Sequence, residues 1–150
     1  MARILVAEDD AETRHLVTQL LIDDGHEVAA VTEAALLLDN LQINPPDLLI
    51  IDVTMPGVDG YAVLEKLHES GHDSSVRVMV LSAGGAEQDF ERSYALGACQ
   101  HITMPFDPYE LVASVAQLLT LTRVEMRELR ELERERAHLL SQLETIFSED

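Results

Sequence analysis

Basic residues are scarce in this 150-residue chain, which carries 10 Lys and Arg against 28 Asp and Glu, a formal net charge of -18. Nucleic acids and anionic membrane surfaces both attract proteins through basic side chains, so the sequence predicts neither kind of partner. The one cysteine, Cys99, excludes an internal disulfide and a cysteine-rich zinc site. No apolar run is long enough to cross a bilayer and no secretory signal opens the chain, so we expect a cytoplasmic protein.

The sequence does contain five short apolar runs, each followed by a segment with helical spacing. The runs are Arg3–Ala7, Val28–Val31, Leu48–Ile51, Val76–Leu81 and Cys99–Ile102. Strands that are apolar throughout and alternate with helices indicate a parallel sheet covered by helices on both faces. In such folds the functional site lies beyond the carboxyl ends of the strands.

Several of these runs end at side chains that can carry chemistry. The first is followed by Glu8, Asp9 and Asp10, the third by Asp52, and the fourth by Ser82. Carboxylates that lie close together repel unless a cation joins them, and oxygen ligands suit Mg²⁺. A carboxylate beside Mg²⁺ can act as a nucleophile toward phosphorus and form an acyl phosphate. Strand ends also carry polar residues because they meet solvent, and for Asp10 that explanation is equally open.

These segments resemble the receiver domain of bacterial two-component response regulators. The likeness lies in Ile4–Asp9, in Asp52 with Met55–Gly60, in Val80–Ala83, in Leu96–Ala98 and in Pro105–Phe106. It implies a flavodoxin-like α/β fold, a doubly wound five-stranded parallel sheet in the order 2-1-3-4-5. The receiver domain is expected over residues 1–121.

The resemblance also implies a role for each residue at the strand ends. Asp52 resembles the phosphoacceptor, Asp9 the direct ligand of Mg²⁺, and Glu8 its partner acting through water. The backbone carbonyl of Thr54 resembles the remaining protein ligand beside Asp52, and Ser82 the hydroxyl that moves onto the phosphoryl group. The implied phosphodonor is a histidine kinase. A receiver of this kind assists its own phosphorylation but turns over no separate substrate.

Met104 departs from the family pattern, which places a lysine immediately before the proline that follows the fifth strand. The charge-assisted hydrogen bond lost with the lysine is worth roughly 1.5–3 kcal/mol, too little to abolish phosphoryl transfer. The loss of this bond is enough to weaken the coupling between phosphorylation and the conformational change. Three residues earlier, His101 stands where the family carries a switching aromatic. It is either a switch residue that can titrate near pH 7 or a surface residue at the strand edge.

Residues 122–150 are predicted to form a helical coiled-coil extension, or a linker to an output domain. No Pro or Gly lies between Thr122 and Phe147, so the fifth helix is expected to continue as one long C-terminal helix. Heptad spacing gives a seam of five apolar residues and one arginine: Leu129, Leu132, Arg136, Leu139, Leu143 and Ile146. This seam predicts a homodimeric coiled coil, with a solvated single helix as the plainer alternative.

Three functions are compatible with these residues. The favoured one is a response-regulator receiver that accepts a phosphoryl group on Asp52 in a Mg²⁺-dependent reaction and relays its state through the C-terminal helix. The second is a degenerate receiver that binds partners without phosphorylation, because Met104 cannot pair with a phosphoryl group. The third is an aspartate-nucleophile phosphatase. Such enzymes need a second acid two residues after the nucleophile, where this chain has Thr54, so the sequence favours signalling over catalysis.

Overall fold

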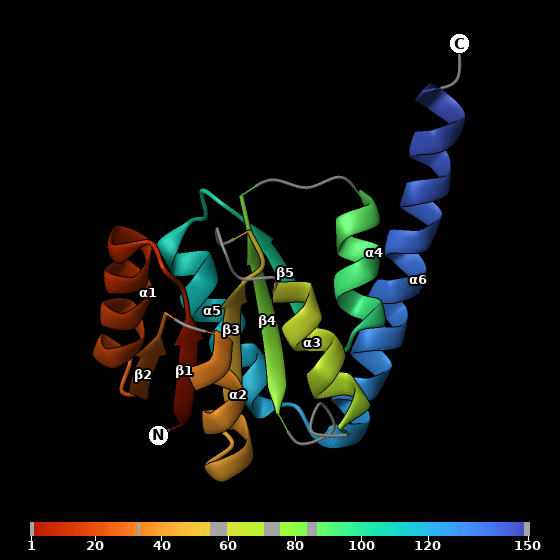
Figure 1. Cartoon of the computed structure of the whole chain (residues 1–150). Helices are drawn as coiled ribbons and strands as arrows, with labels where there is room; N and C mark the ends of the chain where they lie inside the picture. The colour runs from red at the N-terminus through yellow and green to blue at the C-terminus, as the bar shows by residue number, and fades with distance from the viewer. Residues whose placement is uncertain (1, 33, 55–59, 71–75, 84–86, 149–150) are drawn as a thin grey trace.

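The computed structural model describes residues 2–32, 34–54, 60–70, 76–83 and 87–148. In these ranges five strands form one parallel sheet in the order β2-β1-β3-β4-β5. The strands are β1 (Arg3–Ala7), β2 (Glu27–Val31), β3 (Leu48–Asp52), β4 (Arg77–Ser82) and β5 (Gln100–Thr103). The helices are α1 (Ala11–Asp23), α2 (Ala34–Ile43), α3 (Gly60–Glu69), α4 (Glu87–Ala95), α5 (Pro108–Thr120) and α6 (Arg123–Ser148) (Figure 1). The predicted fold class is confirmed.

The sheet separates two apolar cores, because successive side chains of a strand point to opposite faces. In β3, Leu48 and Ile50 join the core beneath α1 and α5, whereas Leu49 and Ile51 join the core beneath α2 and α3. Every residue of β3 is buried. This burial on both faces explains why the strand is apolar throughout and why its carboxyl end opens directly into the loop region above the sheet.

The long C-terminal helix is present, but it is not a continuation of α5. Helix α5 ends at Thr120, and Leu121 is extended with φ -75° and ψ 138°. Thr122 then starts α6 with a reciprocal capping box: the Glu125 N–H donates to Thr122 Oγ1, and the Thr122 N–H donates to Glu125 Oε1, both at 3.1 Å. The Arg77 guanidinium donates to the carbonyls of Leu118 and Leu121 at 2.7 and 2.6 Å. Arg77 therefore supplies donors to carbonyl groups at the end of α5, so the helix can end there without leaving them unpaired.

Helix α6 turns back and runs antiparallel to α4 before its last turns project beyond the domain (Figure 1). Met126 is buried in the core beneath α1 and α5, and Ala137 in the core beneath α2 and α3. His138 Nδ1 lies 2.6 Å from Glu91 Oε1 of α4. The first part of α6 is thus packed on the receiver fold, and only its C-terminal turns stand apart from it.

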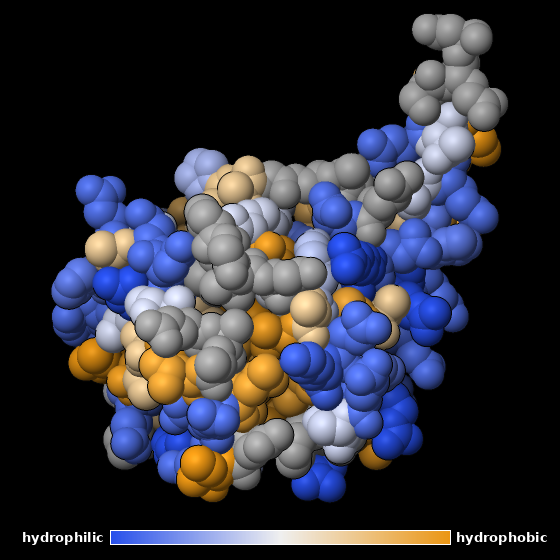
Figure 2. Space-filling model, viewed as in Figure 1, coloured by the Kyte–Doolittle hydropathy of each residue, from blue (hydrophilic) through white to orange (hydrophobic). Residues whose placement is uncertain are grey.

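Hydrophilic residues cover α4 and α6 in the view of Figure 2, while apolar residues gather between α2 and α3. Within the described ranges, no helix combines the length and apolar composition needed to cross a membrane. Arg123, Arg127 and Arg134 of α6 are among the exposed hydrophilic residues.

Candidate functional site

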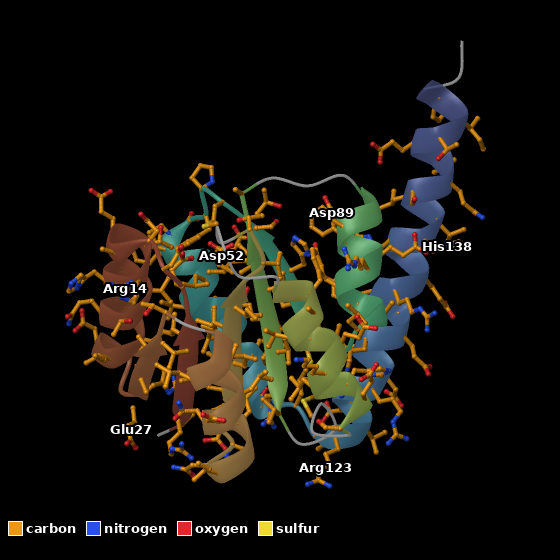
Figure 3. The ribbon with its side chains drawn as sticks, viewed as in Figure 1. Arg14, Glu27, Asp52, Asp89, Arg123 and His138 are labelled. Atoms are coloured by element: carbon orange, nitrogen blue, oxygen red, sulfur yellow. The ribbon has the colours of Figure 1, made fainter. Side chains whose placement is uncertain are left out.

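The carboxyl ends of β1 and β3 bring Glu8 and Asp52 together. Ala7 pairs with Ile51 across the two strands, so the next residue of each chain segment lies at the same rim (Figure 3). Glu8 is only 1 % exposed and Asp52 5 %. Burial, together with the neighbouring Asp52 carboxyl, raises the pKa of Glu8 to about 8. The charged form of Glu8 is therefore disfavoured in this pair, and a cation at the rim would favour it.

Thr54 fixes the orientation of the Asp52 carboxyl. Its backbone N–H and its Oγ1 hydroxyl both donate to Asp52 Oδ1, each at 2.7 Å. The sequence singled out only the carbonyl of Thr54, so these two hydrogen bonds are an additional role. Both hydrogen bonds hold the same carboxylate oxygen of Asp52 at the rim.

The loop after β1 is held in place by α1. Arg14 Nη1 donates to the carbonyls of Glu8 and Asp9, both at 3.2 Å. Asp10 caps the same helix, accepting from Thr13 N at 3.0 Å and from Thr13 Oγ1 at 2.6 Å, and these bonds lower its pKa. Asp10 thus has a structural role as the N-cap of α1, whereas Arg14 is a positioning residue that no motif in the sequence had singled out.

The residues at this rim fit a hard divalent cation. Glu8 Oε1 accepts from the Asp10 N–H at 3.0 Å, but its second oxygen, Oε2, is buried and has no hydrogen-bond partner among the described residues. An oxygen left in this way costs free energy unless a donor or a cation meets it. Within the described ranges no three acidic, His or Cys side chains are already grouped as a complete metal site. Mg²⁺ suits such a sparse set, since it keeps several waters of its own.

His101 connects the end of β4 to α4. Its Nε2 lies 2.8 Å from Ser82 Oγ and its Nδ1 lies 2.8 Å from Ser93 Oγ. Ser93 uses its single hydroxyl hydrogen to donate to the Asp89 carbonyl at 2.9 Å. His101 Nδ1–H must therefore donate to Ser93, and Nε2 must accept from the Ser82 hydroxyl.

His101 is buried, 6 % exposed, with the Phe90 ring centroid 4.2 Å from its own. The alternative that it is a surface residue at the strand edge is therefore wrong. Burial lowers its pKa to about 4, so the ring is neutral near pH 7. Ser93, its partner on α4, lies outside every motif in the sequence and could not have been found from it.

Residues 4–116 match the response regulator receiver domain. The chain belongs to this family. Among curated relatives of this receiver, PcoR, a transcriptional regulatory protein of Escherichia coli, is 34% identical over 123 residues, which are 82% of this chain and 54% of PcoR. Response regulator Rre1 of Synechocystis is 38% identical over 117 residues, 77% of this chain and 51% of Rre1. The chain thus spans about half the length of these relatives.

A solved structure gives the same assignment. The receiver domain of a signal transduction histidine kinase from Syntrophus aciditrophicus superposes with a TM-score of 0.71 at 29% identity. The match covers 80% of this chain and 91% of that domain. The match covers most of the receiver fold. The residues at the rim of the sheet can therefore be compared with the family pattern one by one.

Met104 of this receiver packs against the core beneath α1 and α5, together with Phe106. Its backbone N–H donates to the Ser82 carbonyl at 2.7 Å, which places it directly beside the rim. Within the described ranges, no ion pair joins Glu8 or Asp52 to a cationic side chain. No ammonium therefore replaces the family's lysine there. Met55–Asp59, part of the motif that follows Asp52, lies outside the described residues.

All the predicted seam residues lie on α6, and most of them are on a face that leaves them exposed. Leu132, Leu139, Leu143 and Ile146 are exposed, between 48 % and 63 %. Leu129 packs against the core beneath α1 and α5, and Arg136 lines a cavity beside His101. From Leu132 onward the apolar seam thus points away from the receiver fold.

Proposed function

We propose that this receiver accepts a phosphoryl group on Asp52 from a histidine kinase in a Mg²⁺-dependent reaction. The observation that carries the proposal is the buried pair of Glu8 and Asp52, with the Asp52 carboxyl oriented by Thr54. In the reaction a carboxylate oxygen of Asp52 forms a bond to phosphorus while the bond between phosphorus and the donor imidazole nitrogen breaks. The electron pair of that bond stays on the imidazole.

Glu8, Asp9, Asp52 and the carbonyl of Thr54 are the groups that would hold the metal ion. When bound, Mg²⁺ supplies positive charge against the carboxylates and against the phosphoryl oxygens. The buried Glu8 Oε2, which lacks a hydrogen-bond partner among the described residues, supports this assignment. Arg14 contributes indirectly, because it holds the backbone of Glu8 and Asp9.

The signal passes from Ser82 to α6 through His101. If the Ser82 hydroxyl turns to the new phosphoryl group, His101 Nε2 loses its donor, which costs about 1–3 kcal/mol for a buried acceptor. His101 must then shift or find another partner. It lines a cavity of about 290 Å³ together with Glu133, Arg136 and Ala137 of α6. A movement of His101 would therefore change how α6 packs on the receiver fold.

The exposed apolar stripe of α6 supports a homodimer formed through the C-terminal helices, with residues 1–121 as the receiver and 122–150 as its extension. In such a dimer the last turns, which project past the domain, would pair with those of a second copy. A change at His101 would then alter how the two receivers are held. We expect this signalling assembly to act in the cytoplasm, without binding nucleic acid through this chain.

A degenerate receiver that acts without phosphorylation is the alternative, and Met104 is the observation that favours it. Its side chain packs in the core, so the phosphorylated state lacks the lysine contact of the family. The two functions differ in whether Asp52 takes up a phosphoryl group. The retained pair of Glu8 and Asp52 favours uptake, since an interaction module has no need to bury two carboxyls together.

Titration with Mg²⁺ is expected to shift the backbone amide signals of Asp9, Asp52 and Thr54 at roughly millimolar concentration, as for a site open to water. In Asp52→Asn the same shifts should need a several-fold higher concentration, because one anionic ligand is gone. Glu27→Gln is the matched control, since Glu27 lies at the opposite end of the sheet (Figure 3). An identical response in Asp52→Asn and in the wild type would contradict the assigned site.

A further inference from the structure

A cavity of about 450 Å³ lies between α6, the end of α4 and α3. Four arginines of α6 line it: Arg123, Arg127, Arg130 and Arg134. Their spacing of four, three and four residues places them on one face of the helix. They are four of only ten basic residues in a chain of net charge -18, so their convergence on one cavity is not explained by composition.

The residues that the structure describes offer few partners to the arginines of this cavity. In the described part of the chain, Arg123, Arg127 and Arg134 form no hydrogen bond or ion pair. Arg130 Nε donates to the Met126 carbonyl at 3.4 Å. Among the described residues that line the cavity, Glu131 is the one acid. The site thus carries an excess of positive charge.

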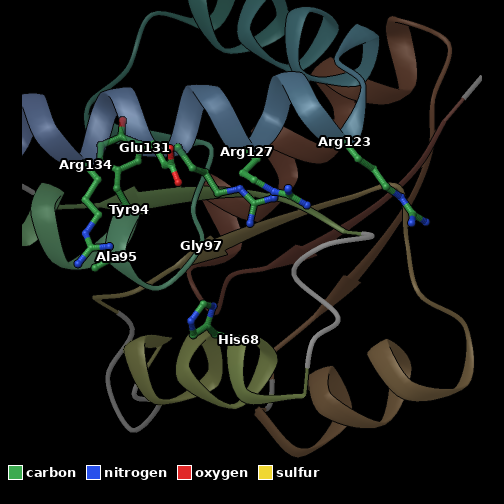
Figure 4. Close-up of a pocket in the computed structure, with 9 residues that line it drawn as sticks. His68, Tyr94, Ala95, Gly97, Arg123, Arg127, Glu131 and Arg134 are labelled. Atoms are coloured by element: carbon green, nitrogen blue, oxygen red, sulfur yellow. The ribbon is translucent and has the colours of Figure 1, made fainter.

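The charge is uneven along the cavity. Glu91, Glu131 and Glu135 line an adjoining cavity that Arg134 shares, so carboxylates surround that end. Of these three acids only Glu131 lies near Arg127, four residues further along α6, and none of them lies within a turn of Arg123 on that helix. Figure 4 shows Arg127 and Arg134 directed from α6 toward the side on which His68 stands, on α3. The Arg123–Arg127 end is therefore the stronger site for an anion.

We propose that the arginine cavity binds a linear oligophosphate, the phosphate chain of a nucleoside di- or triphosphate or a short inorganic polyphosphate. Guanidinium groups pair with phosphoryl oxygens through two parallel hydrogen bonds, which favours phosphate over a simple monovalent anion. The arginines extend over about 16 Å of helix, at 1.5 Å per residue, so several linked phosphoryl groups match them better than one. The cavity volume is also in the usual range for ligands of this size.

This site is separate from phosphorylation at Asp52. Arg123 lies near the end of the sheet opposite to Asp52 (Figure 3). The lining comes from α3, α4 and α6, with His68, Tyr94 and Gly97 facing the arginines. A ligand there would therefore link the C-terminal helix to the receiver fold. The position of α6 would then depend on an intracellular anion as well as on the state of Asp52.

Calorimetric titration of the full chain, in low salt and without Mg²⁺, tests the proposal with tripolyphosphate, ADP and orthophosphate. Tripolyphosphate and ADP are expected to bind, and orthophosphate at least tenfold more weakly. Arg127→Gln should weaken binding about tenfold or more, as expected for a lost charge-assisted pair, and Arg134→Gln less. Arg136→Gln is the matched control, because Arg136 is on the same helix but lines a different cavity, and it should change binding less than twofold.

A second measurement keeps the test valid if a variant is poorly folded. Titration of the wild type should shift the ring signals of His68 and the amide of Gly97, whereas Asp52→Asn should show the same shifts and affinity. Stronger binding of ADP than of tripolyphosphate would identify a nucleotide as the ligand, and equal or weaker binding an inorganic chain. The proposal is overturned if neither binds at millimolar concentration, or if Arg127→Gln and Arg136→Gln have equal effects.

Discussion

Leu139→Glu combined with Leu143→Glu is expected to convert a dimer of this receiver into a monomer without unfolding it. Both side chains are exposed, 60 % and 48 %, and lie on the predicted seam of α6. Burying an apolar side chain of this size between two helices contributes about 1.5–3 kcal/mol, and a carboxylate in its place adds repulsion. Sedimentation at tens of micromolar should show a dimer for the wild type and a monomer for the variant.

Leu36→Glu is the control for this experiment, because Leu36 is equally exposed, 48 %, but lies on α2. It should leave the dimer intact. Removing the chain after Leu121 is a less specific test, since it also takes Met126 and Ala137 out of the two cores. A wild type that sediments as a monomer, or a dimer that survives both glutamates, would contradict the proposed assembly.

Acidification should destabilise the receiver through His101. Its pKa is about 4 when folded and about 6.5 when unfolded, so below about pH 6.5 the unfolded chain binds a proton that the folded chain does not. The stability supplied by the neutral, buried ring is therefore present above pH 6.5 and is lost as the pH falls toward 4. Between pH 7 and pH 5 the contribution of His101 to the free energy of unfolding should fall by about 2 kcal/mol.

Urea unfolding of the wild type and of His101→Phe at these two pH values measures this contribution. The variant should be less stable at pH 7, where it lacks the bonds to Ser82 and Ser93, but should lose about 2 kcal/mol less on acidification. His15→Gln, at an exposed position on α1, is the control and should lose as much as the wild type. Equal losses in wild type and His101→Phe would show that His101 is not held neutral by burial.

The sheet and its rim could be predicted from the sequence because their physical causes are local. A strand buried on both faces must be apolar throughout, as Leu48–Ile51 is, and the next residue of such a strand, Asp52, must lie at the rim. Glu8 and Ser82 follow from the same rule. The hydroxyl of Thr54 could not be predicted in its role, because its bond to Asp52 depends on the turn that follows the strand.

The packing of the C-terminal helix was harder to predict, because one of its faces packs on the domain while another carries the heptad leucines. The heptad leucines are the more apolar stripe, yet the structure places Met126, Ala137 and Ser141 against the domain. Ala137, a small residue, lies beside Phe90 and Tyr94 of α4, and its small side chain lets α6 approach that helix. Counting large apolar residues in the sequence does not reveal this contact. The break before α6 has a signal in Thr122 and Glu125, a capping box that the absence of Pro and Gly had outweighed.

Phosphoryl transfer to Asp52 is tested most directly by the intact mass of the full chain after incubation with a small acyl phosphate donor and Mg²⁺. We predict that the wild type gains the mass of one phosphoryl group, that Asp52→Asn gains none, and that a chelator abolishes the gain. Thr54→Val, which keeps the backbone bond to Asp52 but loses the hydroxyl bond, should slow the gain without preventing it. A wild type that stays at its original mass at saturating donor and Mg²⁺ would contradict the role of Asp52 as phosphoacceptor. The function of a degenerate receiver, which acts without phosphorylation, would then remain.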